Sequence, residues 1–227
     1  MFLSKKLVTY TPVVVYEKTS GASGITDNIV IAPGLYDIVC IGGGGGAAAA
    51  VGGSNTNRTR YWANGGAGGT VRVQVFVHRQ TEVLVVVGHG KMSSTGYFSA
   101  SGASFVGKAG AASGVSGIDD LVLLCNGGSG GSITSVDQSN ANAVGGAVGK
   151  TSVSGSAIKR ILINNTKDIV GPSGSVPSNV TSKPLTWTDN INWEKDPSKG
   201  SGAGVQYNST QYIAQIGRGG YVRITKL

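Results

Sequence analysis

The sequence predicts an all-β fold, a glycine-rich antiparallel β-sandwich with long polar loops. Its recurring unit is a short run of Val, Ile, Leu and Tyr that stops at glycines, which is strand chemistry punctuated by turns. Valines alternate strictly with other residues over 71–77, as in a strand that buries one face. Helical periodicity is almost absent. Residues 156–164 (SAIKRILIN) could form a short helix, but their β-branched isoleucines suit a strand equally well.

Glycine accounts for 38 of the 227 residues, against a typical share of about 7%. The chain is nevertheless 40% hydrophobic and only 13% charged, which is the reverse of the disordered signature. It has 6 prolines and no three-residue glycine period, so it is not collagen-like. The glycines therefore indicate turns and close backbone contacts in a folded β domain, and we expect neighbouring subunits to complete that fold.

The first strand is expected over Leu7–Tyr16, where Pro12 places it at a sheet edge or bends it. Residues 19–28 are polar and glycine-containing and are interpreted as a linker. A strand, a turn at Pro33-Gly34 and a second strand then lead into the five glycines that begin at Gly42.

A hairpin is expected where the alternating run 71–77 is followed by the polar connection 78–81 and a more buried strand over 82–87. Two segments repeat one design: YDIVCIGGGGG at 36–46 and LVLLCNGGSGG at 121–131 both run from an apolar strand through Cys into glycines. This echo suggests that glycine-rich strand ends meet at one end of the sandwich.

The sequence divides into four parts. Residues 1–28 form an N-terminal strand or arm and its linker, 29–131 a glycine-rich β core, 132–215 an excursion rich in Ser and Asn, and 216–227 the closing strand of the core. The excursion is too long for a plain loop.

The charge pattern argues against a nucleic-acid partner. The net charge is +8 and the sequence pI is about 9.6, but the cations are scattered and the adjacent pairs are Lys5-Lys6 and Lys159-Arg160 alone. A nucleic-acid face would cluster them with aromatic stacking partners. The chain also has neither a secretory signal nor an apolar run long enough for a membrane helix, so no membrane insertion is expected.

Two cysteines, Cys40 and Cys125, close very apolar runs and are expected as buried thiols, with a disulfide as the alternative. With His78 and His89 they lack the ligand spacing of a zinc site. The sequence therefore implies no metal and no cofactor.

Several motifs resemble catalytic or nucleotide-binding signatures but lack their context. Gly42–Ala47 fits G-x-G-x-x-A without a following helix or a later acid for the ribose, and 144–152 (VGGAVGKTS) ends like a phosphate-binding loop without the flanking strand and helix. Asp119-Asp120 is interpreted as a structural pair, and no serine lies in a G-x-S-x-G elbow. We therefore expect no catalytic residues and no enzyme activity.

Aromatic residues in polar surroundings are the candidate binding residues. Tyr61 and Trp62 lie in NTNRTRYWAN, and Trp187 and Trp193 lie in TWTDNINWEK. Large aromatics among Asn, Asp, Thr and Arg suit sugar stacking or a protein interface. The alternative is that they pack locally and anchor their loops.

The ordered core motifs resemble the glycine-rich domain of bacteriophage tail and virion proteins. IVIAPGLYDIVCIGGGGG is followed by NGGAGGTVRVQVFVHRQTEVLVVVGHG, LVLLCNGGSGG and the closing GRGGYVRITKL. Matching non-glycine positions carry the resemblance beyond low complexity, namely Pro33, Val71, Val73, Val87, Tyr221, Val222 and Ile224. The excursion 132–215 has no counterpart in that pattern.

This resemblance implies a virion structural protein in a tail, fibre or baseplate, with adhesion to a host-surface glycan or protein. Expected partners are other virion proteins and further copies of the chain, with a trimer favoured. One alternative is a capsid decoration or head-fibre protein. A second is a polysaccharide-degrading tail enzyme, which would need two carboxyl groups about 5 to 9.5 Å apart in a groove.

Overall fold

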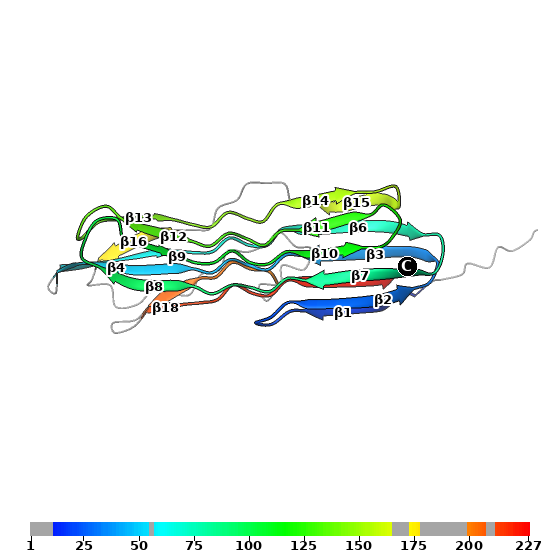
Figure 1. Ribbon diagram of the computed structural model, residues 1–227, viewed down its shortest axis with the longest axis horizontal. Coiled ribbons are helices and arrows are strands. Elements are labelled where there is room, and N and C mark those ends of the chain that lie inside the picture. Colours follow the sequence, from blue (N-terminus) through cyan, green and yellow to red (C-terminus); the bar gives the residue numbers. More distant parts are fainter. Residues whose placement is uncertain (1–10, 55–56, 165–172, 178–198, 208–211) are drawn as a thin grey trace, which may run out of the picture.

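The computed structural model describes residues 11–54, 57–164, 173–177, 199–207 and 212–227. Every regular element in these ranges is a β-strand, so the all-β prediction is confirmed. The strands form two bodies at opposite ends of an elongated molecule, and wavy glycine-rich segments join them (Figure 1). We call the three parts the proximal sandwich, the glycine lattice and the distal tip.

The proximal sandwich consists of two five-stranded sheets. Its first sheet has the order β1 (Val13–Thr19), β19 (Tyr221–Lys226), β3 (Gly34–Ile41), β6 (Thr70–Val77) and β15 (Ile158–Asn164). Its second sheet has the order β14 (Thr151–Ser154), β11 (Val122–Cys125), β10 (Ser113–Ser116), β7 (Thr81–Val87) and β2 (Ile25–Ile31). All neighbouring strands in both sheets are antiparallel.

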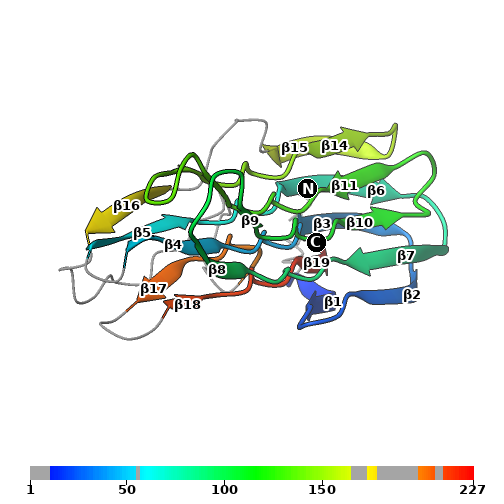
Figure 2. The same ribbon diagram turned by 60° about the vertical axis from the view of Figure 1, so that its left-hand side comes forward.

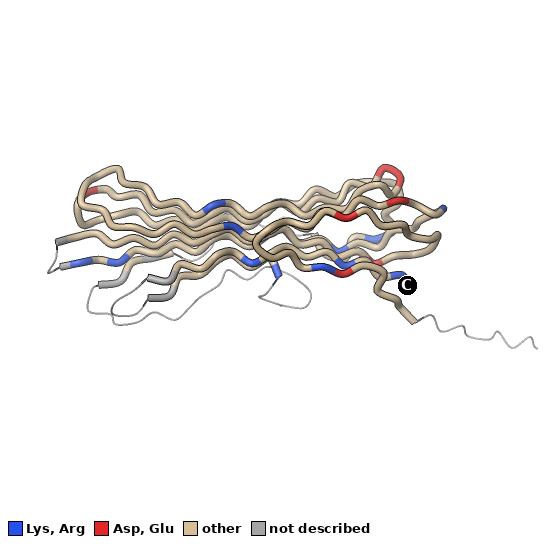
Figure 3. The backbone as a smooth tube through the Cα atoms, turned by 60° about the horizontal axis from the view of Figure 1, so that its bottom comes forward, with Lys and Arg blue, Asp and Glu red and all other residues tan. Residues whose placement is uncertain are grey.

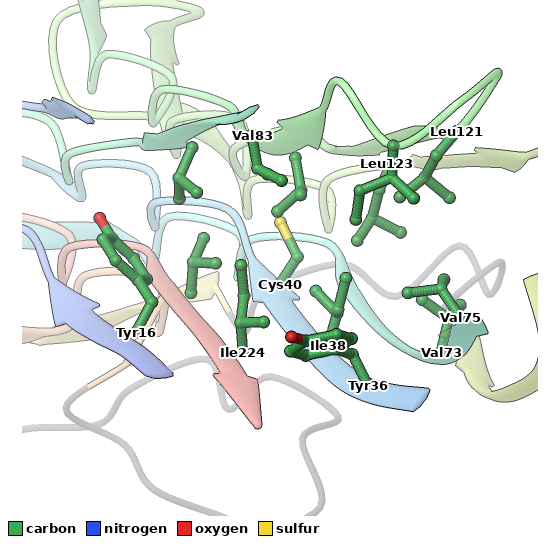
Figure 4. Close-up of a cluster of buried hydrophobic side chains, with 14 of the residues drawn as sticks. Tyr16, Tyr36, Ile38, Cys40, Val73, Val75, Val83, Leu121, Leu123 and Ile224 are labelled. Carbon is green, nitrogen blue, oxygen red and sulfur yellow. The ribbon is translucent and has the colours of Figure 1, made fainter. Parts of the chain in front are cut away.

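The proximal core lies between these sheets and follows the sequence alternation. Val71, Val73, Val75 and Val77 are at most 1% exposed and point inward, whereas Phe76 on the opposite face is 37% exposed. Tyr16, Ile38, Cys40, Leu123 and Ile224 come from both sheets and meet in the same cluster (Figure 4). Burial of these aliphatic side chains is the main stabilising contribution of this body.

Both cysteines are buried free thiols in this core. The Cys125 Sγ lies 3.1 Å from the carbonyl oxygen of Cys40 on the facing sheet. Burial, followed by the neighbouring Cys40, raises the pKa of the Cys125 thiol well above its usual range. The thiols therefore act as small apolar side chains in the core.

The distal tip is smaller. One sheet has the order β16 (Ser173–Pro177), β5 (Asn57–Ala63), β4 (Ala48–Ser54) and β8 (Ser94–Phe98), and a second has the order β13 (Ala141–Val144), β12 (Ser132–Ser135) and β9 (Ser104–Val106). The β17 (Val205–Tyr207) and β18 (Tyr212–Ala214) strands form a hairpin. The pairing of β4 with β8 is parallel. Figure 2 shows these strands at the end away from β1 and β19.

Within the described ranges, eight glycine-rich segments connect the two bodies and pack against one another as the glycine lattice. They are 42–46, 64–69, 88–92, 107–112, 126–131, 145–150, 199–204 and 215–220. The central segment, 42–46, hydrogen-bonds to six others. Its amides donate to the segments 64–69, 107–112 and 215–220, and its carbonyls accept from 88–92, 126–131 and 199–204.

The hydrogen bonds of the central segment repeat every three residues. Gly42 and Gly45 donate to one neighbour, at Gly69 and Gly66, each at 2.9 Å. A β-strand has a repeat of two and pairs in one plane, whereas a three-residue repeat is that of polyproline II and directs amides to three sides. The lattice is therefore a bundle of threefold extended chains and not a sheet.

This geometry explains where glycine occurs. A Cβ added to any residue of the central segment would lie less than 3.0 Å from a backbone atom of a neighbour. Outer segments have fewer neighbours, and their outward positions carry exposed side chains such as Lys108, Ser129 and Ala147. The charged residues of the lattice are all cations, seen as blue without red along the middle of the molecule (Figure 3).

Several local predictions are wrong, because the pattern of a strand does not identify its partner. The expected hairpin over 71–87 does not form: β6 pairs with β3 and β15 in the first sheet, and β7 pairs with β2 and β10 in the second. Part of the expected linker 19–28 belongs to β2, which begins at Ile25. Of the two alternatives for 156–164, a short helix or a strand, the structure has the strand, β15. The glycine-rich strand ends do meet, but between two β bodies and not at one end of a sandwich.

The edge position expected for the first strand is confirmed, since β1 is the outermost strand of its sheet. The described part of β1 begins at Val13, and residues 1–10 lie outside the described ranges. Residues 132–215 add β14 and β15 to the proximal sandwich and two segments to the lattice, so this excursion returns to the core.

Candidate functional site

The distal tip is the part of the molecule best placed to meet a partner. The described N-terminal strand β1 pairs with the C-terminal strand β19 in the proximal sandwich, and the Leu227 amide donates to the Leu35 carbonyl there, at 2.9 Å. Both ends of the described chain are thus held in one body. The opposite body ends in strand connections, which is where recognition residues usually lie on a rigid scaffold.

One of these connections, 136–140, is organised by Asp137. Its Oδ1 accepts hydrogen bonds from the Ser139 and Asn140 amides at 2.8 and 2.7 Å, and its Oδ2 accepts one from the Asn140 side chain at 2.8 Å. These bonds, led by the Asn140 side chain, lower the pKa of the Asp137 carboxyl to about 2. The loop is therefore preorganised, which reduces the entropy lost on binding a partner.

The adjacent connection, 99–103, is held through Ser135. The Ser135 hydroxyl donates to the Ala100 carbonyl and accepts from the Ala103 amide, both at 2.8 Å. Gly102 adopts a left-handed conformation with φ of 83°, which glycine tolerates without a Cβ penalty. The two loops share this strand end and form one ordered surface.

Two of the four predicted aromatic residues, Tyr61 and Trp62, lie within the described residues, and both are packed. The Tyr61 side chain is only 6% exposed, and its hydroxyl donates to the Ser139 carbonyl at 2.9 Å. Trp62 is half-buried against the small apolar cluster of Ala47, Ala49, Ala203 and Val205. The contacts of Tyr61 and Trp62 are therefore those of the second alternative, local packing that anchors the segment. The Tyr61 ring is not exposed for stacking against a ligand. Trp187 and Trp193 lie outside the described residues.

Sequence reasoning missed the exposed aromatic residue of this body, Tyr97. It is 66% exposed on β8, and the Arg58 guanidinium lies over its ring at 5.9 Å from the centroid. It lies opposite Val51 in the β4–β8 register, and Gly52 in the same register lies opposite the buried Phe98. The alternation in STGYF contained that signal: Phe98 faces the core and is 5% exposed, so its neighbour Tyr97 must face away.

A groove opens between the two distal sheets, where β13 and β16 are the edge strands. Its volume is about 480 Å³, and it is lined by Tyr61, Ala141, Asn142, Ala143, Val144, Ser173 and Ser175. The Ser173 hydroxyl donates to the Ala143 carbonyl at 3.0 Å and bridges the two walls. The lining has no ionisable group other than the Tyr61 phenol, so the groove suits an uncharged, hydrogen-bonding ligand.

Glycine amides in both nucleotide-like motifs donate to carbonyls of the lattice. The amides of Gly42–Gly46 all donate to carbonyls of other lattice segments. In the second motif, the Gly149 amide donates to the Ala67 carbonyl at 2.8 Å, and strand β14 follows where a helix would be needed. Both glycine runs serve the lattice.

The acid pair of the sequence lies at the proximal end. Asp120 accepts hydrogen bonds from the Ser156 amide and hydroxyl, at 2.7 and 2.8 Å, and these bonds lower the pKa of its carboxyl. Asp119 has a φ of 49°, so the pair lies in a tight turn before β11. Within the described ranges, no group of three or more His, Cys, Asp or Glu side chains could hold a metal ion.

No protein-family model matches this chain, and no curated protein matches it significantly. In the part of the chain that the structure describes, no helix is long and apolar enough to span a membrane.

Proposed function

We propose that this protein is a structural protein of a bacteriophage particle, a tail, fibre or baseplate component that adheres to the host surface. The observation that carries the proposal is that the glycine lattice separates a large β-sandwich from a smaller tip with ordered loops. The first and last described strands, β1 and β19, belong to a large sandwich, whereas ordered loops and a neutral groove lie at the far end of a lattice.

The lattice supports this role because it is a stiff spacer. Its segments hydrogen-bond to neighbours on several sides, and the central segment uses all of its amides in this way. Around the central segment the neighbours approach so closely that each added Cβ would meet backbone, which leaves no room for a side chain there. A tip held on such a spacer stands clear of the body that anchors it.

An apolar outer face on the proximal sandwich supports assembly with other virion proteins or with further copies, a trimer being the expected state. Leu84 on β7 is 38% exposed, and Val122 and Leu124 on β11 are 47% and 39% exposed. Between them, β10 presents Gly114 and Ser116. The aliphatic side chains of β7 and β11 stand on either side of the small residues of β10, so the surface has a shallow apolar depression that a partner could fill.

Adhesion proceeds by binding and needs no chemical step. Several symmetric copies in one particle would bind the host surface at several tips at once, so that weak individual contacts give a high overall avidity.

Immunogold labelling of intact particles from the phage whose genome encodes this chain tests the location. We expect label on the tail, and the purified protein should bind host cells and compete with infection. Label confined to the capsid would favour the decoration or head-fibre alternative, and absence from purified particles would refute the virion role. Release of reducing sugars from host polysaccharide by the pure protein would refute purely adhesive action.

A further inference from the structure

Three cations of the glycine lattice lie on segments that are direct neighbours. They are Lys91, Lys108 and Arg218, each on a different segment, and we call them the cation patch. The Lys108 amide donates to the Met92 carbonyl at 3.0 Å, and the Gly217 amide donates to the Lys91 carbonyl at 3.0 Å. The segment of Lys91 is therefore bonded to the segments of the other two cations. Residues that are far apart in the sequence are brought together by the lattice.

The three residues also lie at nearly the same height along the lattice. The Lys91 amide donates to the Gly44 carbonyl at 3.2 Å, and the Arg218 carbonyl accepts from the Gly44 amide at 2.8 Å. The Lys108 carbonyl accepts from the Gly46 amide at 2.9 Å. These two glycines are two residues apart, which is about 6 Å along a polyproline II chain. The three backbone positions are therefore close together along the long axis of the molecule.

The backbone hydrogen bonds turn the three side chains away from the lattice. Each of these residues directs its N–H and its C=O to two different segments, one of which is the central segment. For Arg218 the second segment is that of Ser201, whose carbonyl accepts from the Arg218 amide at 3.0 Å. A threefold extended chain has three sides, so the side chain is left with the third. Accordingly, Lys108 and Arg218 are exposed and Lys91 is half-buried.

The cation patch has no acidic residue beside it in the lattice. None of the eight lattice segments contains Asp or Glu, and within the described residues neither Lys91 nor Lys108 makes an ion pair. Gathering like charges is unfavourable, and a bound anion relieves their repulsion. The neighbouring His89 is affected by the same charge, because burial and then the positive charge of Lys91 lower the pKa of its imidazole. The patch is therefore suited to a partner with several negative charges.

The surroundings of the cation patch favour a polysaccharide over a protein or a nucleic acid. A stable protein interface has an apolar core, but the exposed large apolar side chains of the described lattice are only Met92 and Ile216. Single-stranded nucleic acid is bound on aromatic stacking platforms, and no lattice segment contains Phe, Tyr or Trp. An anionic polysaccharide needs neither feature, because ammonium and guanidinium groups bind its anionic groups directly.

We propose that the cation patch binds an anionic polysaccharide of the host surface. The inference rests on the proposed adhesive function and adds to it a second contact, on the flank of the molecule between its two bodies, where Figure 3 shows the lattice cations. Each exposed ion pair is weak and is screened by salt. The contact therefore acts together with the distal tip, since two linked weak contacts bind more tightly than either alone.

The test measures binding of the full chain to immobilised dextran sulfate by biolayer interferometry, with uncharged dextran as the control surface. We expect saturable binding to dextran sulfate and none to dextran. The binding should weaken as NaCl is raised from about 50 mM to about 500 mM, because salt screens exposed charges. Poly-glutamate and oligothymidylate are the acidic-polypeptide and nucleic-acid probes, and both should bind more weakly than dextran sulfate.

Matched variants locate the site. Lys91→Gln combined with Lys108→Gln should weaken binding to dextran sulfate about tenfold, which is about 1.4 kcal/mol and lies in the range of two exposed ion pairs. Lys159→Gln combined with Arg160→Gln removes the same two charges from exposed positions of β15 and should leave binding nearly unchanged. Lys91→Arg combined with Lys108→Arg should retain binding, and equal Tm values of all variants show that each is folded.

Equal weakening by the two glutamine pairs would mean that only the net charge matters and would overturn the inference. Absence of binding to dextran sulfate would do the same, as would tighter binding of poly-glutamate or oligothymidylate. Host-cell binding separates the two proposals. If the wild type binds dextran sulfate but not host cells, the proposed function fails and the polysaccharide site stands. If the Lys91→Gln and Lys108→Gln pair adheres to host cells as strongly as the wild type, adhesion stands and the patch is not one of its contacts, which overturns the inference.

Discussion

Replacing Gly44 by alanine should disrupt the glycine lattice. Gly44 is the middle residue of the central segment, and an added Cβ would lie well inside 3.0 Å of the Ser201 carbonyl, which is backbone and cannot rotate away. The neighbours must separate, and this also strains the bond from the Gly44 amide to the Arg218 carbonyl and that from the Lys91 amide to the Gly44 carbonyl. Overpacking costs about 1 to 3 kcal/mol, and each weakened hydrogen bond about 1 kcal/mol.

The free energy of unfolding should therefore fall by about 3 to 5 kcal/mol, which lowers Tm by about 6 to 20 °C for a chain of this size. Gly21→Ala is the matched control, because a Cβ there would meet nothing within 4 Å and its φ is not in the left-handed region. That change should be neutral or stabilising by up to about 1 kcal/mol. Thermal melting followed by circular dichroism measures both. Equal Tm values for the two variants would refute the close-packed lattice.

Three further predictions concern single interactions. The pKa of the Asp137 carboxyl is lower in the folded than in the unfolded protein, so its contribution to stability is complete above about pH 4 and is lost as the pH falls toward 2. Urea titrations from pH 5 to pH 2 should therefore show a smaller loss of unfolding free energy in Asp137→Asn than in the wild type. Cys40 and Cys125 should not react with a thiol reagent in the native protein, and both should react in denaturant. Rapid reaction of either thiol in the native protein would contradict their burial. Arg72 donates to both carboxylate oxygens of Asp37, at 3.0, 3.0 and 2.7 Å. Arg72→Met should cost about 3 kcal/mol, since it leaves the 5% exposed Asp37 uncompensated. The added change Asp37→Leu should restore most of that loss in chemical denaturation, and failure to do so would mean that Arg72 acts through other contacts.

The candidate site was partly accessible from the sequence. The segment that contains Tyr61 and Trp62 does belong to the distal tip, but the burial of Tyr61 depends on Phe98 from β8 and on Ser139 from the loop after β12. These partners are distant in sequence. The groove also depends on two edge strands, β13 and β16, that belong to different sheets. No local pattern encodes which strand edges stay unpaired.

The strands themselves were largely determined by local chemistry. The valines of 71–77 face the core as their alternation predicts, because successive side chains of a strand point to opposite faces. The same alternation is compatible with any partner strand, and for this reason the hairpin expected with 82–87 was wrong. Pairing was decided by the tertiary packing: β6 and β7 are joined by the short connection 78–80, yet they lie in the two facing sheets.

By itself, the sequence determined that this chain forms strands interrupted by glycine and that its glycines belong to folded structure. Only the tertiary structure decided what those glycines do. A run such as Gly42–Gly46 has no side chains and hence no pattern of faces, so its partners cannot be recognised locally. Six neighbours from distant parts of the chain surround it, and that close approach is the physical reason that each position must be glycine.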